Sequence, residues 1–159
     1  MSNTLFPVFL KTEAAHFLIV GGGNVGLEKT ETLLRQNPDI KITIVATYFH
    51  SNLIEIGKKH SNITFLERPF EEQDLAGVDY VIIATDKPEV NLAIRELAKS
   101  KGIKVNAADQ PALCDFYLGS IVKKGDLKIG ISDIKFDPIK ALVDGSNLNI
   151  NEFGQIVVW

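Results

Sequence analysis

Three glycines, Gly21, Gly23 and Gly26, form the pattern Gly-x-Gly-x-x-Gly directly after the apolar run His16–Val20. In this context the first glycine permits a tight turn, the second lets backbone approach a pyrophosphate, and the third lets the next helix pack close to its strand. That helix directs free N–H groups and the positive end of its dipole at the phosphates. Glycines also serve plain turns, but a strand before the pattern and a helix after it favour a dinucleotide-binding turn.

One carboxylate, that of Asp109, follows the predicted strand Lys104–Ala107. Ligands of wound parallel sheets bind outside the carboxyl ends of the strands, so Asp109 is expected at the mouth of the cleft. There it could accept a proton as a hydride leaves, or orient a polar group of the substrate. An aspartate two residues before Pro111 also fits an ordinary turn, and position alone favours neither role.

Two further loops are expected to bring polar side chains to the same edge. After the predicted strand Ile40–Ala46, Thr47 takes the place where many NAD-binding folds have an acid for the ribose hydroxyls. Because that loop has neither an acid nor an arginine, we expect Thr47 and backbone groups to hold the ribose, which favours NAD over NADP. After Tyr80–Ala84, Thr85 and Asp86 border the expected nicotinamide site, and Asp86 also fits an N-cap of the next helix, a role that capping preferences favour. With Asn106 added, the predicted cofactor-binding residues are Gly21, Gly23, Asn24, Val25, Gly26, Thr47, Thr85, Asp86 and Asn106.

The sequence predicts no metal site and no catalytic nucleophile. The single cysteine, Cys114, excludes an internal disulfide and lacks the partners of a zinc site. A free cysteine is more often a small buried side chain than a nucleophile. The three histidines form no Ser-His-Asp or Cys-His arrangement.

Strands and helices alternate along most of the chain. The predicted strands are His16–Val20, Ile40–Ala46, Ile63–Leu66, Tyr80–Ala84 and Lys104–Ala107, and the predicted helices are Val25–Gln36, one that Ser51 caps, and Pro88–Ser100. Nearly continuous apolar strands that alternate with helices are typical of a parallel sheet with right-handed crossovers. The sequence therefore predicts the α/β class and a Rossmann-type doubly wound parallel sheet.

The pattern changes after residue 113. Phe116–Val122 and Leu127–Ser132 flank the turn Lys123–Asp126, as in a β-hairpin. We therefore predict an NAD-binding domain over residues 1–113 and a small β-rich segment over residues 114–159. Two further extended segments are predicted: Leu5–Leu10, which pairs with a sheet or covers its end, and Gln155–Trp159.

Length and composition favour a globular protein in the cytoplasm. The 159 residues, 45% of them hydrophobic, suit one full domain with an appendage. A net charge of -3 gives no electrostatic reason to expect nucleic acid as a partner. No apolar run is long enough to span a membrane, and the first residues do not have the pattern of a signal peptide.

Several separate blocks resemble the precorrin-2 dehydrogenase family, whose members occur alone or as the N-terminal part of siroheme synthases. The blocks keep the family's order over roughly the first 132 residues, which is far more specific than one glycine motif. They are Phe6-Pro7-Val8-Phe9-Leu10, Leu18 to Gly26, Ala84-Thr85-Asp86 with Asn91, Val105 to Phe116, and Ile121 to Ser132.

The resemblance implies an NAD-dependent oxidation of precorrin-2 to sirohydrochlorin by a homodimer. It implies that the segment after the nucleotide-binding domain forms the dimer interface, and that Asp109 is the catalytic aspartate. In some members the same aspartate is implicated in sirohydrochlorin ferrochelatase activity, so iron insertion is a further expectation. The substrate carries many carboxylates, and Lys123 and Lys124 are candidates to bind them, although a charged hairpin turn explains these lysines equally well.

The chain also departs from the family pattern. Glu28-Lys29 stands where the family usually has Arg-Lys, and residues 133–159 do not match the family's C-terminal helical region, which is expected to be missing. These departures leave open an alternative: a non-catalytic dimeric Rossmann module that senses NAD(H).

Overall fold

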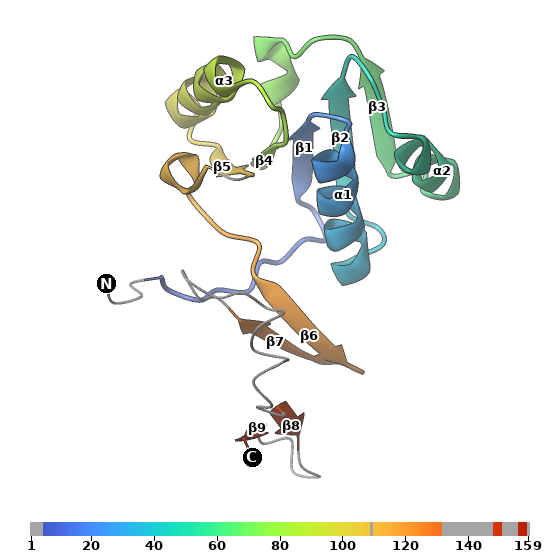
Figure 1. The fold of residues 1–159 in the computed structure, drawn as a ribbon, viewed down its shortest axis with the longest axis vertical. Coiled ribbons are helices and arrows are strands. Elements are labelled where there is room, and N and C mark those ends of the chain that lie inside the picture. The colour runs from blue at the N-terminus through green and yellow to red at the C-terminus, as the bar shows by residue number, and fades with distance from the viewer. Residues whose placement is uncertain (1–4, 109, 132–147, 151–155, 159) are drawn as a thin grey trace. The chain divides into compact units, whose positions relative to one another are not determined.

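The computed structural model describes residues 5–108, 110–131, 148–150 and 156–158 (Figure 1). The chain divides into two compact units, one of residues Phe9–Tyr117 and one of residues 1–8 and 118–159. The boundary predicted at residue 113 lies inside the first unit, because Asp115 and Phe116 hydrogen bond back to that unit's last strand.

The larger unit is a five-stranded parallel sheet in the order β3-β2-β1-β4-β5, which confirms the predicted fold class. The order reverses between β1 and β4, and such a switch point is where doubly wound sheets bind their ligands. Figure 1 shows α1 beside β1 and β2, and α3 beside β4 and β5. The strands are β1 His16–Val20, β2 Lys41–Ala46, β3 Ile63–Glu67, β4 Tyr80–Ile83 and β5 Lys104–Ala107; the helices are α1 Asn24–Gln36, α2 Ser51–Lys59 and α3 Pro88–Ser100, with short 3-10 helices η1 Glu72–Leu75 and η2 Pro111–Leu113.

The central strands form because their side chains are apolar, often β-branched, and buried on both faces. Leu18 and Ile19 of β1, Ile44 of β2, and Val81 and Ile82 of β4 are fully buried. A parallel sheet covered by helices on its faces requires such runs, which is why the predicted strands agree with the observed ones to within a residue or two.

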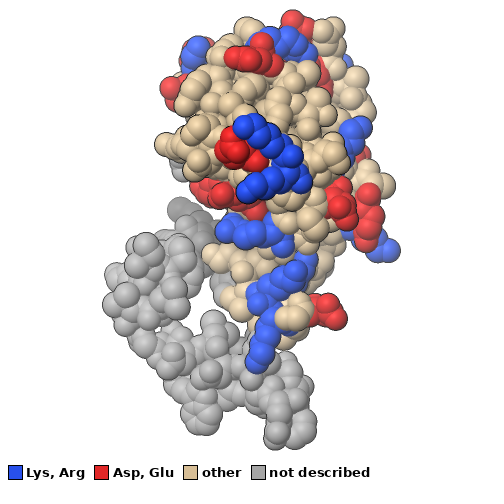
Figure 2. Space-filling view, turned by 90° about the vertical axis from the view of Figure 1, so that its right-hand side faces the viewer, with Lys and Arg blue, Asp and Glu red and all other residues tan. Residues whose placement is uncertain are grey.

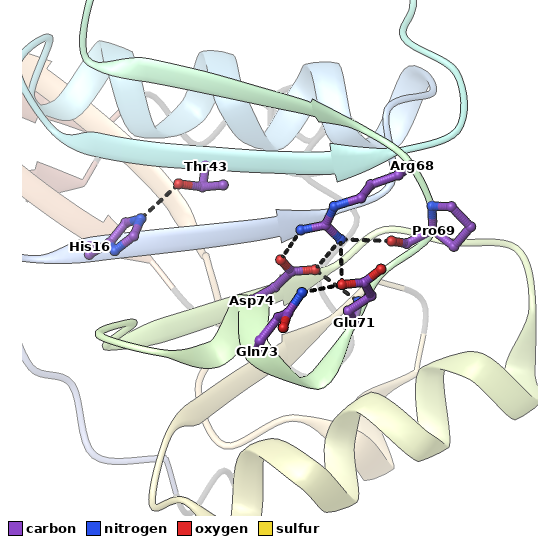
Figure 3. Close-up of polar contacts among 7 residues, drawn as sticks. All are labelled: His16, Thr43, Arg68, Pro69, Glu71, Gln73 and Asp74. Carbon is purple, nitrogen blue, oxygen red and sulfur yellow. Dashed lines mark hydrogen bonds and ion pairs between the residues drawn. The ribbon is translucent and has the colours of Figure 1, made fainter.

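The crossover from β3 to β4 is held by an ion pair (Figure 3). The Arg68 guanidinium donates to both carboxylate oxygens of Asp74, at 3.0 and 2.5 Å, and Asp74 also accepts the N–H of Glu71 at 2.8 Å. Burial raises the pKa of Asp74, but the hydrogen bonds from Arg68 and Glu71 outweigh it and bring that pKa below its ordinary value. The Asp74 side chain is only 3% exposed, so this pair anchors the crossover.

In its described residues, the second unit has two pairs of antiparallel strands. The first pairs β6 Ser120–Lys124 with β7 Leu127–Ile131, and the second pairs β8 Leu148–Ile150 with β9 Ile156–Val158. The first hairpin was expected, but its turn is shorter than predicted, since Gly125 has a φ of +59° and a two-residue turn suffices. Lys123 and Lys124 are therefore strand residues, and the prediction that they form the turn is wrong.

The apolar segment Leu5–Leu10 is not a strand, so the prediction that it pairs with a sheet is wrong. Phe6 is 86% exposed and Phe9 76% exposed. Of the predicted strand Gln155–Trp159, Ile156–Val158 is confirmed and both ends lie outside the described residues. None of the helices in the described residues has the length and apolarity that a membrane crossing requires.

Candidate functional site

The glycine turn lies at the switch point between β1 and β4. Gly21 follows β1 with a φ of +121°, and a Cβ added there would overlap the backbone oxygen of Ala84 after β4. A Cβ on Gly26 would overlap the backbone oxygen of Gly21. The positive φ of Gly21 agrees with the tight turn predicted for it, and its contact with Ala84 is a further role that the sequence did not predict. The absence of a Cβ on Gly26 lets α1 approach the turn after β1, as predicted.

Gly23 differs from the other glycines of the turn, because a Cβ added there would meet nothing within 4 Å. It is the N-cap of α1, and neither a side-chain cap nor an acidic residue satisfies the first turn of that helix. The N–H groups of Asn24, Val25 and Gly26 lack an intrahelical partner at such a terminus and favour an anion. Open space at Gly23 and uncapped N–H groups beside it fit the pyrophosphate of a dinucleotide.

Gly22 is a residue that the sequence reasoning missed. It is buried, a Cβ there would overlap the backbone oxygen of Tyr48, and its own carbonyl accepts the N–H of His50 at 2.7 Å. The loop after β2 therefore rests directly on the glycine turn. The run of three consecutive glycines is the signal that could have indicated this close approach.

The loop after β2 places Thr47 in an exposed position at the carboxyl edge, where the sequence predicts a ribose contact. That contact stays a prediction. The next helix, α2, has His50 as its N-cap, and the His50 Nδ1 accepts the N–H of Asn52 at 3.1 Å. The expected cap, Ser51, is instead the first residue of the helix.

The loop after β4 is ordered by Thr85 and Asn91. The Thr85 hydroxyl donates to the Asn91 Oδ1 and accepts the N–H of Lys87, while the Asn91 Nδ2 donates to the Thr85 carbonyl at 3.1 Å. Asp86 does not cap α3, so the favoured capping role is wrong: Pro88 begins the helix, which makes Lys87 the N-cap and leaves Asp86 outside it. The Asp86 side chain is exposed, and its predicted cofactor contact is untested.

The loop after β5 begins beside the end of β4. Asp109 lies outside the described residues, but its neighbours are placed: the Ala108 N–H donates to the Ile83 carbonyl at 3.0 Å, and the Gln110 N–H to the Ala107 carbonyl at 3.3 Å. Asn106 is buried and its Nδ2 donates to the Phe116 carbonyl at 2.9 Å. The Asn106 Nδ2 thus has a hydrogen-bond partner within the protein. The contact of Asn106 with the cofactor stays a prediction.

Cys114 packs against the same strand. Its Sγ lies 3.2 Å from both the N and the O of Ala107, and burial raises the pKa of the thiol. A thiol that stays protonated and hydrogen bonded fits the expectation that Cys114 is not a nucleophile. Within the described residues, no group of three His, Cys, Asp or Glu side chains could hold a metal ion.

The loops after β1, β2, β4 and β5 are thus joined into one edge of the larger unit. The contacts that join them are Gly22 with the loop after β2, Gly21 with Ala84, and Ala108 with β4. Lys123 and Lys124 belong to β6 in the second unit. Figure 2 shows blue Lys and Arg side chains among tan uncharged ones in the lower part of the described surface.

Comparisons with known proteins agree with this geometry. A protein-family model described as "Putative NAD(P)-binding" matches residues 8–120. The chain is 37% identical over 135 residues to the siroheme synthase of Pseudoalteromonas translucida and 33% identical over 135 residues to that of Nitrosococcus oceani, each match covering 85% of this chain. It spans 28% of the length of these relatives. Among solved structures, "SirC, precorrin-2 dehydrogenase" has the same fold, with a TM-score of 0.67 at 22% identity over 88% of this chain and 68% of that one.

Proposed function

This chain belongs to that NAD(P)-binding family, and from this premise we propose that it is a dehydrogenase that uses NAD to oxidise precorrin-2 to sirohydrochlorin. The observation that carries the proposal is the joined edge of the sheet, where the open glycine turn contacts the loop after β4, and β4 in turn bonds to the start of the loop after β5. Two observations support the choice of substrate. The chain is 37% identical to a siroheme synthase in a match that covers 85% of the chain, and it contains the motif blocks of the precorrin-2 dehydrogenase family.

Each loop of the edge has a part in the proposed reaction. The N–H groups at the start of α1 bind the pyrophosphate, and Thr47 holds a ribose hydroxyl. Bound NAD supplies a nicotinamide that takes up a hydride from the tetrapyrrole. The Asp109 carboxylate accepts the proton that the substrate loses with that hydride, so precorrin-2 gives up two electrons and two hydrogens in all.

The assembly and location belong to the same proposal. We expect a homodimer, supported by apolar side chains that the described residues leave exposed, and a cytoplasmic location, which cell fractionation tests. The binding of substrate carboxylates by Lys123 and Lys124 and the ferrochelatase activity stay predictions.

The test is anaerobic incubation of the purified chain with precorrin-2 and NAD. NADH and sirohydrochlorin should appear together and in equal amounts. Asp109→Ala should abolish turnover while the affinity for NADH, measured by fluorescence titration, stays within about twofold of the wild type. NADH binding by a wild-type chain that never turns over would instead favour the non-catalytic NAD(H)-sensing module.

A further inference from the structure

The residues that follow the Asp109 loop return alongside β5 and bond to it. This segment, Cys114–Phe116, is called the return segment here. The Asp115 N–H donates to the Val105 carbonyl at 2.7 Å, and the Phe116 carbonyl accepts from the Asn106 side chain at 2.9 Å. With the Cys114 thiol beside Ala107, every β5 residue from 105 to 107 has a partner on the return segment. Ala107 and Cys114, which stand before and after the stretch of sequence that contains Asp109, are therefore bonded to each other.

Asp115 makes the strongest of these connections, because its carboxylate bonds on two sides. One oxygen accepts the Val105 N–H at 3.0 Å, and the other lies 2.8 Å from the Arg95 Nη2 on α3. The Asp115 side chain is 24% exposed and the Arg95 side chain 14% exposed. A charge-assisted hydrogen bond in a partly buried place is stronger and more directional than one between exposed groups.

Arg95 stands one helical turn after Asn91, so both residues occupy the same side of α3. Asn91 is buried and bonds twice to Thr85, in the loop after β4. One helix thus holds both loops: the cofactor-side loop through Asn91, and the loop of the proposed proton acceptor through Arg95 and Asp115.

We propose that Asp115 is a positioning residue, which with Arg95 fixes the Asp109 loop relative to α3 and so to the cofactor. This role rests on the proposed function, since it presumes that Asp109 accepts a proton. Proton transfer requires the base within hydrogen-bond reach of its target, and a misplacement of about 1 Å costs about 10²-fold in rate. Loss of the Asp115 carboxylate frees the return segment at its strongest connection and should therefore lower kcat.

The test compares Asp115→Ala and Asp115→Asn with the wild type in the precorrin-2 assay, with rates expressed per folded molecule. Asp115→Ala should lower kcat about 10- to 100-fold while the dissociation constant of NADH changes less than about twofold. Asp115→Asn keeps an acceptor for the Val105 N–H but loses the charge toward Arg95, so its kcat should be intermediate. Arg95→Ala added to Asp115→Ala should lower kcat little further, because both changes break the same ion pair.

The matched control is Asp74→Ala. Asp74 also pairs with an arginine and accepts a backbone N–H, but in the crossover between β3 and β4. Its loss should lower the melting temperature and leave kcat per folded molecule unchanged. An Asp115→Ala kcat within twofold of the wild type, or an equal loss in Asp74→Ala, would overturn the positioning role alone. A wild-type chain without turnover would overturn the proposed function and this role together.

Discussion

At the scale of the residue, two glycines of one turn have different roles: we expect Gly21 to serve the fold and Gly23 to serve cofactor binding. The same substitution to alanine at each position distinguishes these roles. Gly21→Ala forces a side chain onto a φ of +121° and into the Ala84 carbonyl, so it should lower the free energy of unfolding by about 2–5 kcal/mol. Gly23 has a φ of -82° and open space around its Cα. Gly23→Ala should stay within about 0.5 kcal/mol of the wild type in urea titrations, yet weaken NADH binding about tenfold or more. Equal NADH affinities for Gly23→Ala and the wild type would contradict the proposed contact between the pyrophosphate and Gly23.

His16 makes the fold sensitive to pH at the opposite end of the sheet (Figure 3). Its Nε2 lies 2.9 Å from the Thr43 Oγ1 and its Nδ1 3.1 Å from the Gly77 carbonyl, while Asp79 accepts the His16 N–H. Burial, reinforced by the charge of Lys41, lowers the pKa of His16 below 6.5, against the opposing effects of Gly77 and Asp79.

Because the folded chain holds the His16 proton less tightly than the unfolded chain does, unfolding takes up a proton in the pH range between the folded-state pKa and the ordinary value of 6.5. The stability that neutral His16 gives is complete above that pH and declines as pH falls toward the folded-state pKa. His16→Gln, which cannot take a charge, should flatten this part of a plot of unfolding free energy against pH. An unchanged slope in His16→Gln would assign the pH dependence to other groups.

The part of the candidate site that the sequence predicts best is the turn whose conformation requires glycine. The spacing indicates the turn because two of its positions require glycine: Gly21 has a positive φ, and a Cβ on Gly21 or Gly26 would overlap backbone. Asp86 was misjudged because the N-cap is the residue directly before the first helical residue: Pro88 begins α3, so Lys87 is the N-cap and Asp86 stands one position too early. The role of Asp115 was not foreseeable, since it depends on Arg95, which is distant in sequence and becomes a neighbour only when α3 packs on the sheet.

At the scale of the element, the sheet was predictable to within a residue, whereas the peripheral segments were predicted only in part. The central strands β1 and β4 are buried on both faces, so their apolar runs carry the signal by themselves. Leu5–Leu10 is also apolar, but it contains Pro7 and does not have strand structure, so an apolar run alone did not identify a strand here. The observed hairpin turn is shorter than the predicted one because Gly125 adopts a positive φ. The strand pairing therefore continues through Lys123 and Lys124.

At the scale of the whole molecule, the second unit exposes apolar side chains that a monomer would leave in water. Val122 and Leu127 of the first hairpin are 46% and 40% exposed, and Phe6 and Val8 of the same unit are 86% and 63% exposed. A lone two-stranded hairpin is marginal in water, and apolar patches of this kind mark interfaces. Because the resemblance to the precorrin-2 dehydrogenase family implies a homodimer, we expect a second copy of this chain to cover the unit.

Sedimentation should therefore give a mass twice the 17.5 kDa of one chain. Val122→Ser removes an apolar contact worth about 1.5 kcal/mol and should weaken the dimer about tenfold. Leu92→Ser is the matched control, since Leu92 is 51% exposed but lies on α3 of the other unit, and it should leave the dimer unchanged. A wild-type chain that sediments as a monomer, or two variants that weaken the dimer equally, would contradict an interface built on the hairpin. A dimer that Val122→Ser weakens and Leu92→Ser does not would assign the exposed hairpin to the dimer interface.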